Sequence, residues 1–222
     1  MAPSPRTREE LLARAEALAG RTLEEIAADL GGALGPLGLH GKGTVGGLVE
    51  RALGATGGSA ATWDFPELET ELKTVPLAPS GVPRESTYVC TLPLLDVDEL
   101  EWETSWARRK LSRVLFVPVR VGESRLGAPV LFSPTAEQDA ILRADFDELV
   151  GTIGAGGIEG LTARVGRWMQ VRPKAAHGGV RTRAVGPEGS TLETVPRGFW
   201  AQAWMPLAPK KAYEDYVGRE TP

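Results

Sequence analysis

The chain has 222 residues, of which 42% are hydrophobic and 24% are charged. This length and composition fit one large domain or two closely packed lobes, and they exclude a disordered chain. The sequence has no apolar run of about 18 residues and no signal-peptide core, which predicts a cytoplasmic protein with no membrane partner. The single cysteine, Cys90, excludes an internal disulfide and a cysteine-based zinc site, and we expect it to be buried.

The formal net charge of −4 conceals an uneven distribution. Residues 1–160 carry 15 Lys and Arg against 24 Asp and Glu, whereas residues 161–222 carry 10 against 5. A basic segment in an acidic protein indicates a surface for a polyanion such as nucleic acid. The alternative is that an acidic and a basic part of the protein attract each other.

Two short helices are predicted at the start of the chain. Apolar residues recur at helical spacing over 7–19, where Thr7 and Glu10 have the spacing of a capping box. Thr22 and Glu25 repeat that spacing before a second helix. Neither helix carries residues that indicate chemistry.

A glycine-flanked lysine and a third helix follow. Lys42 lies between two glycines, a setting that allows close approach to a phosphate, although the spacing of a Walker loop is absent. The pattern over 44–53 predicts a helix that carries Glu50. A lone helical glutamate is most often solvated, but a loop of small residues separates Glu50 from Asp64, so both could reach one site.

The stretch WDFPELETELKTVP, residues 63–76, has the pattern D-x6-E-x-K, formed by Asp64, Glu71 and Lys73. Side chains alternate between the faces of a strand, so Glu71 and Lys73 would share one face. Two carboxylates could hold Mg²⁺, and a neighbouring lysine could orient a water bound to that ion and stabilise charge on a phosphate. The alternative is a solvated charged face at a sheet edge.

The middle of the chain predicts an α/β fold. Strands over 68–76 and 86–92 flank a turn rich in Pro and Gly, and they predict a hairpin. The remaining elements are a basic helix, two apolar strands and a long acidic helix, over 105–113, 114–121, 129–132 and 135–153. The basic helix face is either solvated or in contact with a DNA backbone.

The C-terminal part contains the basic segment. Alternation over 168–172 predicts a half-exposed strand, which leads into a loop that holds Lys174 and His177. A final apolar strand lies within 195–204. The histidines have no ligand-spaced partners, so we expect them to be loop residues.

Four separated stretches carry a resemblance to a known family: LGATGGSAATWDFPELETELKTVP, WETSWARRKLSRVLFVPV, LTARVGRWMQVRPKAA and PRGFW. In order and spacing they resemble the MutH family of mismatch-repair endonucleases over roughly 11–204. The resemblance implies a restriction-endonuclease-like mixed sheet flanked by helices, with two lobes, about 1–105 and 106–222, around a DNA cleft.

The resemblance also implies the reaction and the partners. MutH-type proteins nick the unmethylated strand at hemimethylated GATC sites of double-stranded DNA, use Mg²⁺ and are activated by MutL with ATP. We therefore expect a monomeric, nucleoid-associated enzyme with a MutL-like activator. The runner-up is a type II restriction endonuclease of the same fold that cuts both strands, and the third reading is a catalytically idle DNA-binding protein. The intact acid pair and lysine argue against the third reading.

The resemblance assigns roles by position. Asp64, Glu71 and Lys73 match the family's catalytic motif, with Asp64 and Glu71 as metal ligands. Glu50 matches a helix carboxylate close to the metal ions. Lys110 falls at an additional active-site lysine.

Further positions match the family's DNA contacts. Lys42 falls at a lysine near the scissile phosphate, and Arg172 and Lys174 fall in the DNA-reading loop. Trp200 stands where the family usually has a tyrosine that faces the adenine carrying or lacking the methyl group. This departure changes the residue that would sense the methyl group. The chain after Trp204 matches the family poorly, and this is the part that the family uses in activation by MutL.

Overall fold

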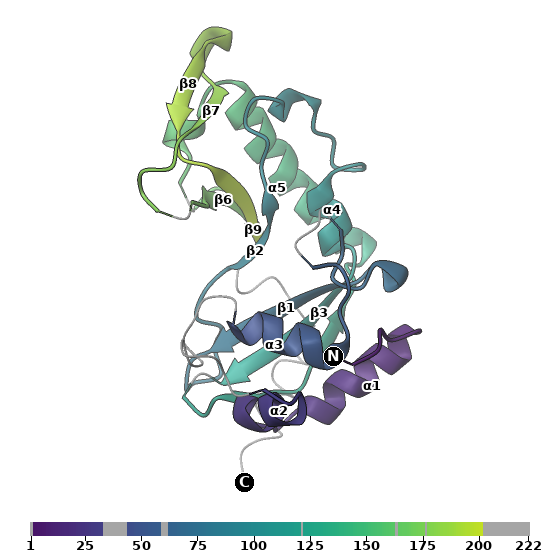
Figure 1. The fold of residues 1–222 in the computed structure, drawn as a ribbon. Coiled ribbons are helices and arrows are strands. Elements are labelled where there is room, and N and C mark those ends of the chain that lie inside the picture. Colours follow the sequence, from purple (N-terminus) through teal and green to yellow (C-terminus); the bar gives the residue numbers. More distant parts are fainter. Residues whose placement is uncertain are drawn as a thin grey trace. The chain divides into compact units, whose positions relative to one another are not determined.

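The computed structural model describes residues 2–32, 44–58, 62–120, 122–162, 164–175 and 177–201 (Figure 1). The described residues form two compact units, the first within 1–85 and 113–133 and the second within 86–112 and 134–205. Each unit thus draws on separate segments, which differs from the single boundary near residue 105 that the sequence suggested. The reason is that the strand after residue 113 pairs with the strand that begins at Glu71.

The first unit consists of a mixed sheet with helices. Its strands are β1 (Glu71–Leu77), β3 (Val114–Arg120), β4 (Arg125–Leu126) and β5 (Val130–Phe132). β1 and β3 are parallel, whereas β4 and β5 both pair with β3 antiparallel. The helices are α1 (Arg8–Leu18), α2 (Leu23–Asp29), α3 (Thr44–Leu53) and the 3-10 turn η2 (Pro66–Leu68). α3 packs against β1 (Figure 1).

The helix caps agree with the sequence in one case and differ in part in the other. At α2 both bonds of the capping box between Thr22 and Glu25 are present. At α1 the Thr7 side chain accepts a hydrogen bond from the Glu10 backbone N–H, as predicted, but the Glu10 carboxylate accepts from the N–H of Arg6 instead. The predicted box is therefore only half formed there.

The predicted hairpin of residues 68–76 and 86–92 is wrong. The chain does turn at 79–82, but the antiparallel pairing stops after the single bridge between Leu77 and Pro83. Proline has no N–H to extend a ladder. β1 instead joins β3, and β2 (Thr87–Thr91) belongs to the second unit, where it pairs with β9 (Arg197–Ala201).

One apolar cluster joins the helices of the first unit to its sheet. The buried residues come from α1, α2, α3, the segment before β1 and the strands: Leu11, Leu23, Ile26, Leu48, Leu53, Phe65, Leu72, Leu115 and Val117. Burial of side chains of this size stabilises the fold by about 1.5–3 kcal/mol each. In the described part of the chain, no helix is long and apolar enough to cross a membrane.

The second unit combines a three-stranded antiparallel sheet, in the order β2-β9-β6, with a β7–β8 hairpin and two helices. Its further elements are η3 (Val97–Glu99), α4 (Trp106–Leu111), α5 (Ala136–Gly154), η4 (Ile158–Gly160), β6 (Met169–Pro173), β7 (Thr182–Val185), η5 (Pro187–Gly189) and β8 (Thr191–Thr194). Phe146 of α5 packs between the rings of Trp102 and Phe199. Cys90 is buried, as predicted.

Hydrogen bonds to a buried carboxylate connect α5 to the start of β6. Asp145 is 5% exposed and accepts hydrogen bonds from three successive backbone N–H groups, at 2.8 Å from Arg167, 2.6 Å from Trp168 and 2.8 Å from Met169. Gly166 precedes them with φ of 83°, and a Cβ there would lie 1.9 Å from the Met169 carbonyl oxygen. Only glycine fits this turn.

The predicted half-exposed character of the strand at 168–172 is wrong at its centre. Gln170 is only 4% exposed. The turn held by Asp145 leads directly into β6, which pairs with β9 and contacts α5, and the Gln170 side chain accepts a hydrogen bond from Arg172.

The first testable prediction concerns Asp145. Asp145→Asn replaces one accepting oxygen by an NH₂ group that faces backbone donors, so at least one buried N–H loses its partner. We expect the free energy of unfolding to fall by about 1–3 kcal/mol. Urea unfolding followed by tryptophan fluorescence measures the change.

The matched control is Asp147→Asn on the same helix. The Asp147 side chain is 58% exposed and pairs with an exposed arginine, so loss of its charge should change stability by less than about 0.5 kcal/mol. Equal urea midpoints for Asp145→Asn and the wild type would contradict the role given to Asp145.

Candidate active site

Glu71 and Lys73 come together at the start of β1. They share a face of the strand, as the alternation predicts, and the Lys73 Nζ donates a hydrogen bond to Glu71 Oε1 at 2.7 Å. The Glu71 side chain is 2% exposed and that of Lys73 is 22% exposed. A carboxylate this deeply buried needs a charged partner, and Lys73 supplies one.

The loop before η2 brings Asp64 to the same place. Asp64 Oδ2 accepts a hydrogen bond at 2.7 Å from the backbone N–H of Leu72, the residue between Glu71 and Lys73. The Asp64 carbonyl oxygen accepts from the N–H groups of Thr56 and Gly57 at 3.0 and 3.1 Å. These bonds fix the loop on both sides, so the carboxylate is held against β1.

The pKa of Asp64 reflects the charged groups around it. Burial raises the pKa of Asp64 to about 6, and the negative charge of Glu71 raises this pKa as well. The N–H of Leu72 and the ammonium of Lys73 act in the opposite direction. Glu50 adds a smaller upward contribution. The site therefore gathers carboxylates that repel one another around one lysine.

Glu50 reaches this region from α3. A Cβ built on Gly46 would lie 3.8 Å from Glu50 Oε1 and 3.9 Å from Thr74 Oγ1. The Glu50 carboxylate thus lies near the residue that follows Lys73 on β1. The charge of Glu50 also acts on the pKa of Asp64, whereas a shared role of the two carboxylates stays a prediction.

The donor set fits a hard divalent cation. Two carboxylates whose repulsion raises the pKa of Asp64 would be stabilised by positive charge between them. Within the described ranges, no group of three or more His, Cys, Asp and Glu side chains could hold a metal ion. An ion at this site would rely on two carboxylates and water, which suits Mg²⁺ because it keeps several waters.

Two further predicted residues are lysines. Lys110 lies on α4 in the second unit, where its Nζ is 5.9 Å from the centre of the Trp106 ring. The predicted Lys42 lies outside the described residues.

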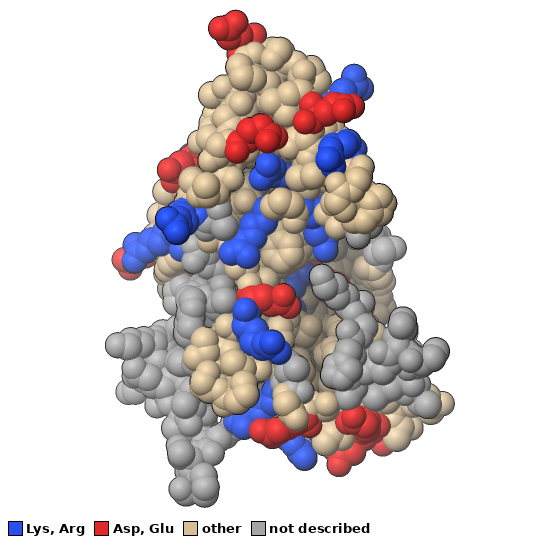
Figure 2. Space-filling view, turned by 90° about the vertical axis from the view of Figure 1, so that its left-hand side faces the viewer, with Lys and Arg blue, Asp and Glu red and all other residues tan. Residues whose placement is uncertain are grey.

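Arg172, Lys174 and Trp200 lie near one another in the second unit. Lys174 Nζ is 5.8 Å from the centre of the Trp200 ring, and Arg172 Nε donates to Gln170 Oε1 at 2.8 Å. On the face shown in Figure 2, several Lys and Arg side chains gather over this unit.

Sequence reasoning missed Tyr88, which joins this group. Its ring meets that of Trp200 edge to face with centres 5.4 Å apart, and Lys174 Nζ lies 4.6 Å from its centre. The two aromatic residues are paired across β2 and β9. The wrong hairpin assignment for the strand at 86–92 concealed this contact, because it assigned β2 to the wrong partner.

Comparison with known proteins gives a consistent result. The family model described as DNA mismatch repair enzyme MutH matches residues 53–145, a range that contains Asp64, Glu71, Lys73 and Lys110. The DNA mismatch repair protein MutH of Escherichia coli strain 536 is 46% identical over 203 residues, which cover 88% of each chain. The protein of the same name from Vibrio cholerae serotype O1 is 43% identical over 206 residues, or 90% of this chain and 93% of the other.

The similarity extends far beyond the short motif on β1 and confirms the resemblance that the four sequence stretches indicated. It also confirms the kind of activity that the resemblance implied, a DNA endonuclease of mismatch repair. The chain belongs to the MutH family of DNA mismatch-repair endonucleases.

Proposed function

We propose that this chain nicks the unmethylated strand of double-stranded DNA at hemimethylated GATC sites, as a monomer with a restriction-endonuclease-like fold, and that a MutL-like protein activates it. The observation that carries the proposal is the cluster of Asp64, Glu71 and Lys73 on and beside β1, in a chain of the MutH family. A DNA-binding protein without activity would have no need to bury a carboxylate next to a lysine at this cost in desolvation.

The reaction is hydrolysis of one phosphodiester bond. Asp64 and Glu71 would hold Mg²⁺, assisted by Glu50, and the bound ion would supply positive charge that activates water and stabilises the phosphate. Lys73 is held by Glu71 in a fixed orientation. Its ammonium group can donate a hydrogen bond to the attacking water and stabilise charge that develops on the phosphate oxygens.

The other family positions contribute charge and recognition. Lys110 adds a second cation for the phosphate in this proposal, and Lys42 contacts the DNA near the bond to be broken. The planar guanidinium of Arg172 suits a guanine edge, whereas Lys174 suits a phosphate. Because Lys174 lies over the Tyr88 and Trp200 rings, its charge is presented together with an aromatic surface.

The second testable prediction concerns the chemistry. Glu71→Gln removes a metal ligand and the partner of Lys73, and Lys73→Ala removes the cation. Each should lower the single-turnover nicking rate by about 10²–10³. The Glu71→Gln protein should still bind the GATC duplex, because the carboxylate that it lacks repels phosphate.

Glu67→Gln is the control, since Glu67 is an exposed residue of η2 only four positions away. It should nick at the wild-type rate. A Glu71→Gln protein as active as this control would rule out the site.

The third prediction concerns pH. A metal ligand must be deprotonated, and the pKa of Asp64 is raised to about 6. Protons therefore compete with Mg²⁺ as the pH falls through this value, and the apparent Mg²⁺ affinity should drop by about tenfold per pH unit below pH 6 while staying level above it.

Mg²⁺ titrations monitored by calorimetry between about pH 5 and pH 8 measure this dependence. In Asp64→Asn the affinity should be weaker at every pH, and the inflection near pH 6 should vanish. An affinity that is constant over the whole range in the wild type would refute the assignment of Asp64 as a ligand.

The fourth prediction concerns methyl recognition, because Trp200 lacks the hydroxyl group of the tyrosine usual in the family. An indole offers an apolar face and a single donor but no acceptor. In the described part of the chain, its Nε1 is buried without a hydrogen-bond partner. We expect the bias against the methylated strand to be weaker than in a relative with tyrosine at this position, and Trp200→Tyr to sharpen it without altering the Mg²⁺ requirement.

Nicking of unmethylated, hemimethylated and fully methylated GATC duplexes, with and without MutL, tests this. Strong bias in the wild type that persists in Trp200→Ala would exclude a role for Trp200.

The same duplexes test the runner-up. Cutting of both strands of the unmethylated duplex in one binding event would identify a restriction-type enzyme.

A further inference from the structure

The helix that carries Lys110 is short. α4 has six residues, and Ser105 caps it by accepting a hydrogen bond from the Arg108 N–H at 3.1 Å. Only Ala107 and Leu111 are buried, at 1% and 4% exposure. Such a short helix has little stability of its own. Contacts with the neighbouring elements must therefore set its rotation.

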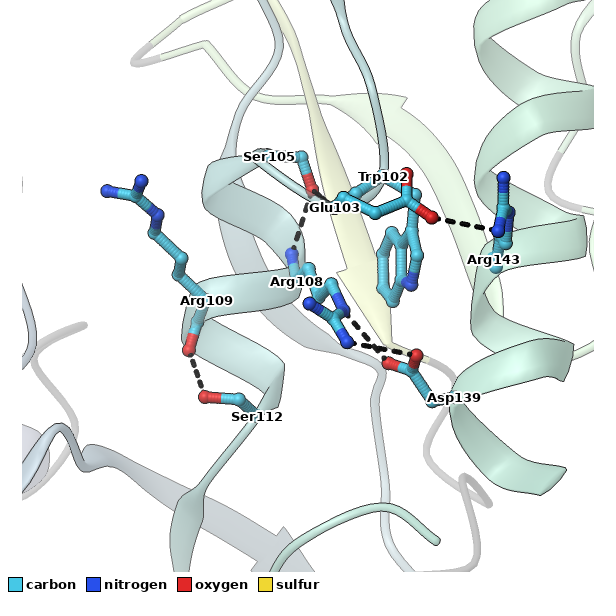
Figure 3. Close-up of polar contacts among 8 residues, drawn as sticks. All are labelled: Trp102, Glu103, Ser105, Arg108, Arg109, Ser112, Asp139 and Arg143. Atoms are coloured by element: carbon cyan, nitrogen blue, oxygen red, sulfur yellow. Dashed lines mark hydrogen bonds and ion pairs between the residues drawn. The ribbon is translucent and has the colours of Figure 1, made fainter. Parts of the chain in front are cut away.

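The geometry of α4 separates its basic residues. Successive residues differ by about 100° around a helix, so Ala107 and Leu111 define the buried face, and Arg108 and Lys110 lie on its two opposite edges. Arg109 points away from that face. Figure 3 shows Arg108 directed to α5 and Arg109 extending away from it. Fixing Arg108 therefore fixes the direction in which Lys110 leaves the helix.

Arg108 is fixed by a two-point contact. Its Nε and Nη2 each lie 3.3 Å from a different oxygen of Asp139 (Figure 3). A guanidinium fork on a carboxylate restrains orientation as well as distance. Asp139 lies in the first turn of α5, whose residues Leu142 and Phe146 are fully buried in the second unit. α4 is thereby anchored to a rigid element.

We propose that the Arg108–Asp139 pair positions Lys110 for DNA cleavage, Arg108 and Asp139 being positioning residues that touch no substrate themselves. The inference rests on the role proposed for Lys110. Loss of either partner leaves the fold intact but lets α4 rotate, so the ammonium of Lys110 loses its alignment with the phosphate.

The chain supplies a matched control. Glu103 and Arg143 form another ion pair, at 2.8 Å, between the segment before α4 and the same helix α5 (Figure 3). Both side chains are more than half exposed, at 52% and 55%. This pair joins the same parts of the unit but includes no residue of α4, so its loss should not alter the rotation of the helix.

The experiment compares Arg108→Gln, Asp139→Asn and the double variant in single-turnover nicking of a GATC duplex at saturating Mg²⁺. We expect each single variant to lower the maximal rate by roughly 10- to 100-fold, and the double variant to be no slower than either, because all three remove the same contact. The DNA concentration for half-maximal rate should stay within about twofold of the wild type, and melting temperatures should fall by no more than about 2–4 °C. Glu103→Gln and Arg143→Gln should match the wild type.

The Asp139→Asn variant separates positioning from direct contact. If Arg108 bound DNA itself, Asp139→Asn would free it, and cleavage or binding would be unchanged or stronger while Arg108→Gln weakened binding and flattened its salt dependence. That result would overturn the inference. So would equal loss in the Glu103 and Arg143 variants, which would indicate general destabilisation.

Lys110→Ala distinguishes this inference from the proposed function. In a Lys110→Ala background, Arg108→Gln should cause no further loss of rate. A Lys110→Ala protein as active as the wild type would refute the role proposed for Lys110. An inactive Lys110→Ala protein together with a fully active Arg108→Gln protein would refute the positioning role alone.

Discussion

The candidate site depends on the burial of one charge, the carboxylate of Glu71. Its side chain is 2% exposed, and such a charge destabilises a protein unless it is paired. Lys73 lies 2.7 Å away on the same face, and the parallel register of β1 with β3 fixes that face. A slip of one residue would turn both charges into the apolar cluster. The sheet and the chemistry therefore constrain each other.

The same burial of carboxylates lowers the stability of the folded protein. Asp64 is held beside Glu71 by its bond to the Leu72 N–H, although burial and the charge of Glu71 raise its pKa to about 6. A single lysine cannot neutralise this group of carboxylates. A divalent cation, as in the proposed reaction, would relieve this repulsion, and such repulsion is the usual compromise between stability and a preorganised site.

Local patterns in the sequence predicted the structural features that depend on residues close together in the chain. The cap at Thr22, the helix over 44–53 and the shared face of Glu71 and Lys73 follow from hydrogen bonds or alternation within a few residues. The partner of β1 does not follow from such signals. A turn rich in Pro and Gly indicated a hairpin. The apolar, buried strand β3 instead pairs with β1 along its whole length. Because of this non-local pairing, the strand that follows β1 belongs to the other unit.

The contacts that sequence reasoning missed are those between residues far apart in the chain. Tyr88 meets Trp200 through the β2–β9 pairing, and Arg108 meets a carboxylate 31 positions later. From the sequence, the basic residues of α4 formed one face that was either solvated or in contact with DNA. In the structure Arg108 is bound to α5, whereas Lys110 lies on the opposite edge of the helix. A motif identifies which chemistry a chain can perform, but the contacts between elements decide which of several like charges on a helix is paired within the fold and which points in another direction.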